Sequence, residues 1–200
     1  MANARSEPAP ALGFLSVVEH AEHGLFGGYL ILNANGRPLE FHCTAPVKAN
    51  RAQEILYGPT LKPFLYGEQI GQTLVRKGQV EPLLICTDHE ALLSVREFCS
   101  IPVVMVAGQS PFHPSLPILQ FRLGSQSVAV LSTFGNDQEL VQRRWQAHEL
   151  KLELLEPFSR IREAIEEAQR GMRTSNGAPL SSIPAASGTV GSPPTSATVS

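Results

Sequence analysis

The sequence predicts a single α/β (or α+β) domain with a mixed sheet of about seven strands and about five helices. Three observations predict this fold. Apolar runs of strand length recur along the chain, two pairs of them are joined by hairpin turns, and a strand–helix–strand run lies between the hairpins. We therefore expect two hairpins that flank one parallel βαβ unit, in a two-layer or a three-layer arrangement.

The first hairpin follows an apolar, partly β-branched strand at residues 12–19. Strands at 28–33 and 39–44 flank the pair Asn35-Gly36. An Asn-Gly pair between two strand-like runs favours a tight turn, because both residues tolerate positive φ.

Two helices are expected after this hairpin. A capping-box pattern at Asn50 begins the first helix, and the pair Gly58-Pro59 ends it. Thr60 caps the second helix, which carries Gly67 and Gly71 on one face. Because glycine costs helix stability, this repetition predicts close packing, either against the sheet or against a second subunit.

The parallel unit follows at residues 82–107. Pro82–Thr87 is a short continuous apolar run, as in a strand covered on both faces, and residues 101–107 form a second one. Between them, Asp88 is a good N-cap for a helix from His89 to about Cys99. A compact unit of this kind should be parallel and right-handed.

The last predicted elements are a second hairpin and two helices. Strands at 119–123 and 127–133 enclose the turn 124–126, and helices follow at 137–150 and 157–171.

The two ends of the chain differ from the part between them. Residues 1–11 read as a loose arm. In residues 172–200, 22 of 29 residues are Ser, Thr, Ala, Gly or Pro, a composition that cannot offset the entropy of ordering, so we expect a disordered tail. The domain should occupy residues 12–171.

Composition and charge restrict the function. The net charge of −2 argues against a dedicated nucleic-acid binder, and no apolar run reaches the roughly 18 residues of a membrane span. The N-terminus lacks the apolar core of a secretory signal. Three widely spaced cysteines do not form a disulfide framework. We expect a cytoplasmic protein with no nucleic-acid partner and no membrane partner.

The carboxyl ends of the two parallel strands carry the candidate site. Ligands usually bind there, because the N–H groups of the following helices are free. We expect ligand contacts from both strand ends, namely Thr87, Asp88, Gly108, Gln109 and Ser110. The candidate catalytic residues are Cys86, Asp88 and His89. A structural interpretation stays open, with Asp88 as a helix cap, Cys86 as a buried apolar group and His89 in a solvated first turn.

Two chemistries would use these residues. Cys86 near a helix N-terminus partly meets the needs of a thiolate nucleophile, with His89, His42 or His113 as its base. A metal site would combine Cys86 with His89. However, His42 and Cys43 point to opposite faces of a strand and cannot both bind one ion. We therefore expect no metal and no cofactor.

Residues 26–71 read FGGYLILNANGRPLEFHCTAPVKANRAQEILYGPTLKPFLYGEQIG. This segment resembles an uncharacterised bacterial protein family, over about residues 13–131. The resemblance implies no activity and no site.

A complete fold pattern without a phosphate-binding loop or other catalytic motif favours a non-catalytic protein. We expect it to bind a partner protein or a small ligand at the carboxyl edge of its parallel strands. The alternatives are a hydrolase or transferase that uses Cys86, Asp88 and His89, and a metal-binding protein. Charged residues make up 17% of the chain, against roughly 25% in typical domains, which favours a homodimer or a protein partner.

Overall fold

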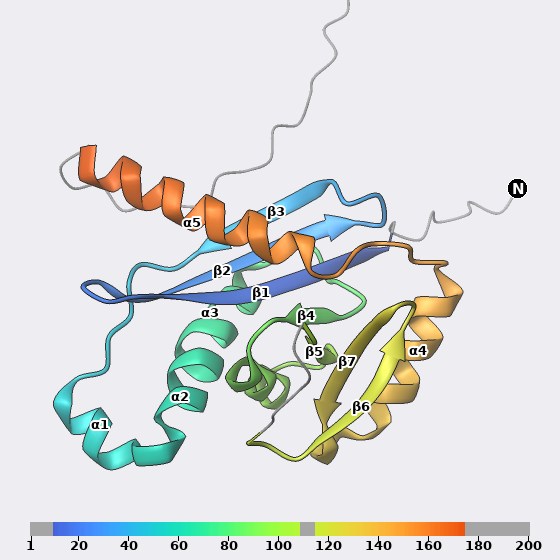
Figure 1. Ribbon diagram of the computed structural model, residues 1–200, viewed down its shortest axis with the longest axis horizontal. Helices are drawn as coiled ribbons and strands as arrows, with labels where there is room; N and C mark the ends of the chain where they lie inside the picture. Colours follow the sequence, from blue (N-terminus) through green and yellow to red (C-terminus); the bar gives the residue numbers. More distant parts are fainter. Residues whose placement is uncertain (1–9, 109–114, 175–200) are drawn as a thin grey trace, which may run out of the picture.

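The computed structural model describes residues 10–108 and 115–174, which form one seven-stranded sheet with helices around it (Figure 1). The strand order is β3-β2-β1-β4-β5-β7-β6, and the sheet is mixed. The predicted fold class, a single mixed α/β domain, is confirmed. The predicted arm and tail lie almost wholly outside the described residues, as do Gln109 and Ser110.

Three antiparallel strands form one half of the sheet: β1 (Ala11–His20), β2 (Gly24–Asn33) and β3 (Pro38–Cys43). The Asn-Gly turn between β2 and β3 is confirmed, with Gly36 at φ +74°.

β2 begins four residues earlier than expected, because its glycines read as a connection in the sequence. Two of these glycines, Gly27 and Gly28, instead allow close packing on the two faces of the sheet. A Cβ on Gly27 would lie 2.1 Å from Ile70 on one face of the sheet, and a Cβ on Gly28 would lie 2.4 Å from Ile161 on the other.

The predicted parallel unit is confirmed, with β4 (Ile85–Thr87) beside β5 (Val103–Val106). The expected helix between them is a 3-10 helix, η3 (Glu90–Phe98). Its cap was predicted wrongly. The helix is capped by His89, whose ring nitrogen Nδ1 accepts the Ala91 N–H at 3.1 Å, and not by the Asp88 side chain. β1 is also parallel to β4, a pairing that the sequence did not predict.

The second hairpin, β6 (Ile118–Leu123) with β7 (Gln126–Leu131), is confirmed, and β7 pairs antiparallel with β5. Beyond it lie a 3-10 turn η4 (Ser132–Phe134), α4 (Asn136–Ala147) and α5 (Glu156–Thr174).

Helix α1 (Arg51–Tyr57) starts with the predicted capping box at Asn50. A continuous helical stretch follows the turn η1 (Gly58–Thr60). It consists of α2 (Leu61–Pro63), the π-helix η2 (Phe64–Gln72) and α3 (Thr73–Lys77).

Gly67 and Gly71 of η2 do mark close packing, mainly against η3. A Cβ on Gly67 would lie 1.9 Å from Ser94 Oγ, and a Cβ on Gly71 would lie 2.3 Å from Val95. Neither glycine is left for a second subunit, because both are buried within this chain.

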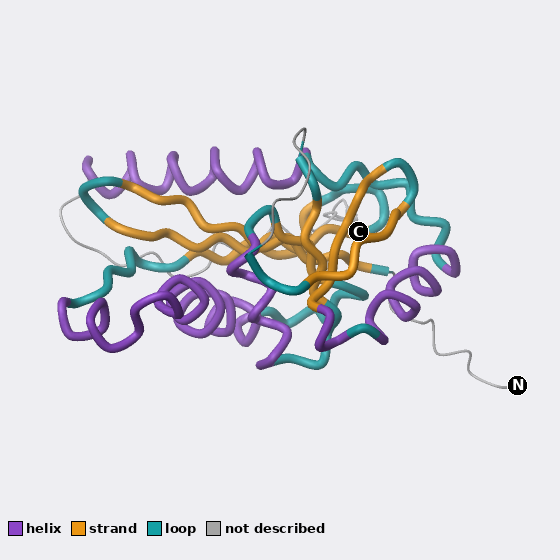
Figure 2. Tube along the Cα trace, turned by 60° about the horizontal axis from the view of Figure 1, so that its bottom comes forward, coloured by secondary structure: helices purple, strands orange, loops and turns teal. Residues whose placement is uncertain are grey.

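Helices cover both faces of the sheet, so the arrangement has three layers (Figure 2). One core lies between the sheet and η2, α3 and η3, and a second lies between the sheet and α4 and α5. No helix in residues 10–108 or 115–174 is long and apolar enough to cross a membrane.

Candidate functional site

The candidate site lies at the edge of the sheet where the long strand β1 extends past the short strand β4. The parallel pairing of β1 with β4 ends at Leu15 and Thr87, yet β1 continues to His20. The last five residues of β1 therefore extend past β4, as Figure 1 shows. Side chains from β1, from the residues after β4 and from the flanking helices meet in this space, at the carboxyl ends of two parallel strands.

The edge site consists of Ser16 of β1, Asp88 after β4 and Arg162 of α5. The Ser16 hydroxyl donates to Asp88 Oδ1 at 2.8 Å, and Arg162 Nη1 donates to Asp88 Oδ2 at 2.8 Å. Arg162 Nη2 also lies 3.4 Å from the Ser159 hydroxyl one turn earlier on α5. Ser16 is buried, whereas the side chains of Asp88 and Arg162 are 24% and 46% exposed. Solvent and solutes can therefore reach the ion pair.

The Tyr66 group adjoins the edge site and consists of Glu19, Lys62, Tyr66 and His89. The Tyr66 hydroxyl donates to Glu19 Oε1, and Lys62 Nζ lies 3.5 Å from the same oxygen. The hydrogen bond from Tyr66 lowers the pKa of Glu19, and Lys62 lowers it further. Burial, followed by that same bond, raises the pKa of Tyr66. Glu19 is thus held as a carboxylate and Tyr66 as a neutral phenol.

His89 lies half-buried against Tyr66, with the two ring centroids 4.5 Å apart. Burial lowers the pKa of His89, and the nearby Lys62 ammonium lowers it further, so the ring is neutral at pH 7. Because Nδ1 accepts the Ala91 N–H, the ring proton lies on Nε2.

The structure separates the predicted catalytic residues. Asp88 contacts α5 on one side of the sheet, and the adjacent His89 contacts η2 on the other. Thr87 is buried, and its hydroxyl accepts the His89 N–H at 3.2 Å. Gly108 is exposed, and Gln109 and Ser110 lie outside the described residues.

Cys86 does not fit the predicted role of nucleophile. Its side chain is fully buried in the core beneath α5, and burial raises the pKa of its thiol. A thiol that stays protonated and is out of reach of solvent is unreactive. The structural interpretation of Cys86 as a small buried apolar group is the one that the geometry supports.

The described residues do not provide a set of ligands for a metal ion. Residues 10–108 and 115–174 contain no group of three His, Cys, Asp or Glu side chains that could hold an ion. At the edge site itself, both oxygens of Asp88 are already engaged, one by a hydroxyl and one by a guanidinium.

Sequence reasoning missed five contributors to these clusters: Ser16, Glu19, Lys62, Tyr66 and Arg162. Ser16 carries a local signal, because it is a lone polar residue inside an apolar strand. Arg162 carries none, since it lies 74 residues from Asp88 and looks like any exposed arginine on an amphipathic helix.

Comparisons with known proteins give only distant likenesses. No protein-family model and no curated protein matches the chain. Among solved structures, the catalytic domain of human endonuclease V matches with a TM-score of 0.43 and 14% identity over 83% of each chain. Endonuclease V of Ciona intestinalis, in complex with an inosine-containing DNA, has a TM-score of 0.38 and 10% identity over 70% of this chain and 85% of that one.

The Argonaute of Marinitoga piezophila, in complex with a guide RNA, matches 60% of this chain and 22% of its own length, with a TM-score of 0.30 and 12% identity. At these values the likeness concerns the fold alone. The matched structures are an endonuclease and a guide-RNA complex, and neither agrees with our expectation of a non-catalytic protein that binds a protein or small ligand and has no nucleic-acid partner. We therefore withdraw that expectation, and with it the description as a binding protein.

Proposed function

We propose that this chain acts on nucleic acid, binding a phosphodiester at the edge site and hydrolysing it. The observation that carries the proposal is the position of the Arg162–Asp88 pair, which joins a phosphate-binding cation and a proton-accepting carboxylate at a solvent-accessible strand edge.

Arg162 is the phosphate-binding group of the edge site. A guanidinium matches two oxygens of a phosphate, and its fork geometry suits nucleic-acid backbones. In the free protein its Nη1 holds Asp88 and its Nη2 faces Ser159. Because the side chain is 46% exposed, a phosphate can take over these N–H groups. Lys62 of the adjoining Tyr66 group, whose side chain is 65% exposed, supplies a second cation.

Asp88 is the general base in this proposal. When a phosphate takes Arg162, Asp88 Oδ2 loses its partner, while the Ser16 hydroxyl still fixes Oδ1. A water oxygen attacks the phosphorus, and the water proton passes to Oδ2. The bond from phosphorus to the leaving sugar oxygen breaks, and that oxygen takes a proton from solvent. A positioned base of this kind contributes roughly a hundredfold to ten-thousandfold in rate.

Hydrolysis is tested with fluorescently labelled single-stranded and duplex DNA and RNA, with products separated on denaturing gels. We expect Asp88→Asn to lower the cleavage rate at least about a hundredfold while the substrate still binds. The matched control is Glu163→Gln, an exposed carboxylate next to Arg162 on α5, which should cleave as the parent protein does. Absence of product from all four substrates, or an equal loss in the control, would overturn hydrolysis at Asp88.

The cytoplasm is the compartment that we propose for this activity. Cys43, Cys86 and Cys99 are all free thiols, and they are the three cysteines of the chain. Free thiols persist in the reducing cytosol and are oxidised in secretory compartments.

A further inference from the structure

A pocket of about 450 Å³ is lined in part by Glu19, Lys62 and Tyr66 of the Tyr66 group, and of its lining residues the proposed function uses Lys62 alone. The end of the β1–β2 hairpin, the segment at 47–49, Glu54 of α1 and the start of the helical stretch at 61–66 line it, and it is open to solvent. Its volume falls in the range of about 300–1,000 Å³ typical of small-molecule sites. We propose that this pocket binds a small organic anion with an apolar body.

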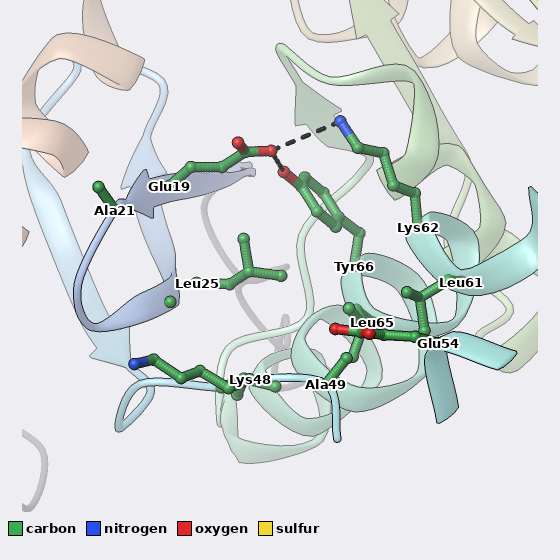
Figure 3. A pocket seen from close by; sticks show the side chains of 12 residues that line it. Glu19, Ala21, Leu25, Lys48, Ala49, Glu54, Leu61, Lys62, Leu65 and Tyr66 are labelled. Atoms are coloured by element: carbon green, nitrogen blue, oxygen red, sulfur yellow. Dashed lines mark hydrogen bonds and ion pairs between the residues drawn. The ribbon is translucent and has the colours of Figure 1, made fainter. Parts of the chain in front are cut away.

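The wall of the pocket is partly apolar and partly charged. Leu25 of the hairpin and Leu61 and Leu65 of the helical stretch contribute aliphatic side chains, and Val47 and Ala49 add two more from the segment at 47–49. In Figure 3, Leu25 lies in the middle of the pocket, with Glu19 and Tyr66 at one end and Lys48 at the other. An apolar ligand body would pack against these aliphatic side chains.

The charges of the pocket leave one cation without a carboxylate. Glu19 is paired with Lys62 and bonded to Tyr66 at one end. Glu54 pairs with Arg51 at 3.0 Å. Lys48 Nζ instead donates to the backbone carbonyl of Glu22, a neutral acceptor. No carboxylate oxygen in the described residues lies within ion-pair distance of Lys48, so a positive charge stands at this end of the pocket.

The backbone fixes the stem of Lys48 in place. Gly24 has φ +93°, and a Cβ there would lie 2.5 Å from both Lys48 Cγ and the Val47 carbonyl oxygen. Leu25 and Val47 exchange two backbone hydrogen bonds, each with a distance of 2.8 Å between the nitrogen and the oxygen. The segment that carries Lys48 is therefore held tightly against the start of β2, and Lys48 Nζ lies at the Glu22 carbonyl, at the hairpin end of the pocket. A partly apolar pocket with one cation that has no carboxylate partner favours an anion with an apolar body.

Two fluorescent probes test this proposal on the full-length chain. Anilinonaphthalene sulfonate carries an anion on a flat aromatic body, and phenylnaphthylamine has a similar body without charge. We expect saturable binding of the sulfonate to a single site, about tenfold tighter than binding of the neutral probe. Lys48→Gln should remove this preference by weakening sulfonate binding about tenfold, with neutral-probe binding unchanged. Lys77→Gln, at an exposed lysine on α3, should leave both unchanged.

Equal affinity for the two probes, unsaturable binding, or the same result from Lys48→Gln and Lys77→Gln would overturn the anion pocket. Near-ultraviolet circular dichroism of each variant shows that the probes report a folded pocket, since such dyes also bind partly unfolded chains. Lys48 takes no part in the proposed hydrolysis. If Lys48→Gln cleaves nucleic acid as the parent protein does, its change in probe binding reports on this pocket and not on the edge site.

Discussion

Within the described residues, Tyr29 has a buried side-chain polar atom without a hydrogen-bond partner. Its side chain is fully buried in β2, and its hydroxyl has no hydrogen-bond partner in the described residues. The ring lies over Gly13 of β1, where a Cβ would come within 2.8 Å of the hydroxyl oxygen. A buried hydroxyl without a partner costs roughly 1–3 kcal/mol of stability. The large apolar ring must offset this cost.

Removing the Tyr29 hydroxyl should therefore not harm the fold. We expect Tyr29→Phe to raise the free energy of unfolding by about 1 kcal/mol, because it deletes the unpaired group and keeps the ring. Urea denaturation followed by circular dichroism measures the change. Tyr66→Phe is the contrasting variant, since it deletes a hydroxyl that donates to Glu19, and it should lower stability. A clear loss of stability in Tyr29→Phe would contradict the assignment of an unpaired hydroxyl.

At the scale of elements, the start of η3 depends on His89. Its ring caps the helix through Nδ1, and it can do so only while Nδ1 is unprotonated. The charged groups that face this ring are Lys62 of α2, Glu19 of β1, and Asp88 and Glu90 beside it. Burial and Lys62 outweigh the three carboxylates, and the folded pKa of His89 lies below the ordinary value of 6.5.

This cap makes stability depend on pH. Below pH 6.5 the unfolded chain takes up a proton at His89 that the folded chain does not. The free energy of unfolding should therefore include the whole contribution of this cap above pH 6.5. It should fall as the pH drops from 6.5 toward the lowered pKa of His89 in the folded chain. His89→Asn keeps a cap oxygen without titrating, so it should lose less stability over this interval.

Urea unfolding at several pH values between 8 and 5 makes this comparison. The matched control is His148→Asn, at an exposed histidine after α4, which should follow the parent protein. If His89→Asn shows the same pH dependence as the parent protein, the protonation-sensitive cap is wrong.

Elements set by local patterns were predictable from the sequence, and those set by distant partners were not. The Asn50 capping box and the Asn-Gly turn at Gly36 depend on neighbouring residues, and both are present. The π-helical form of η2 and the 3-10 form of η3 arise where the two helices pack closely through Gly67. Helical periodicity predicts a helix, but it does not predict whether its hydrogen bonds follow the α, π or 3-10 pattern.

At the scale of the whole molecule, the same limit applies to the candidate site. Asp88 was predictable because it follows a buried parallel strand. Ser16 and Arg162 reach it from 72 and 74 residues away, and only the pairing of β1 with β4 and the packing of α5 bring them there. The three-layer arrangement thus places the cation Arg162 beside Asp88, and Arg162 is the basis of the proposed nucleic-acid function.

The central claim, that Arg162 binds nucleic-acid phosphate, is tested most directly by the salt dependence of oligonucleotide binding. Fluorescence anisotropy over a series of salt concentrations gives the slope of log affinity against log salt. For Arg162→Gln we expect weaker binding and a slope smaller in magnitude by about one, the value for one lost phosphate contact. Arg170→Gln, further along α5, should keep the parent slope. Identical slopes for the parent protein and Arg162→Gln, or no binding by the parent protein, would contradict the claim.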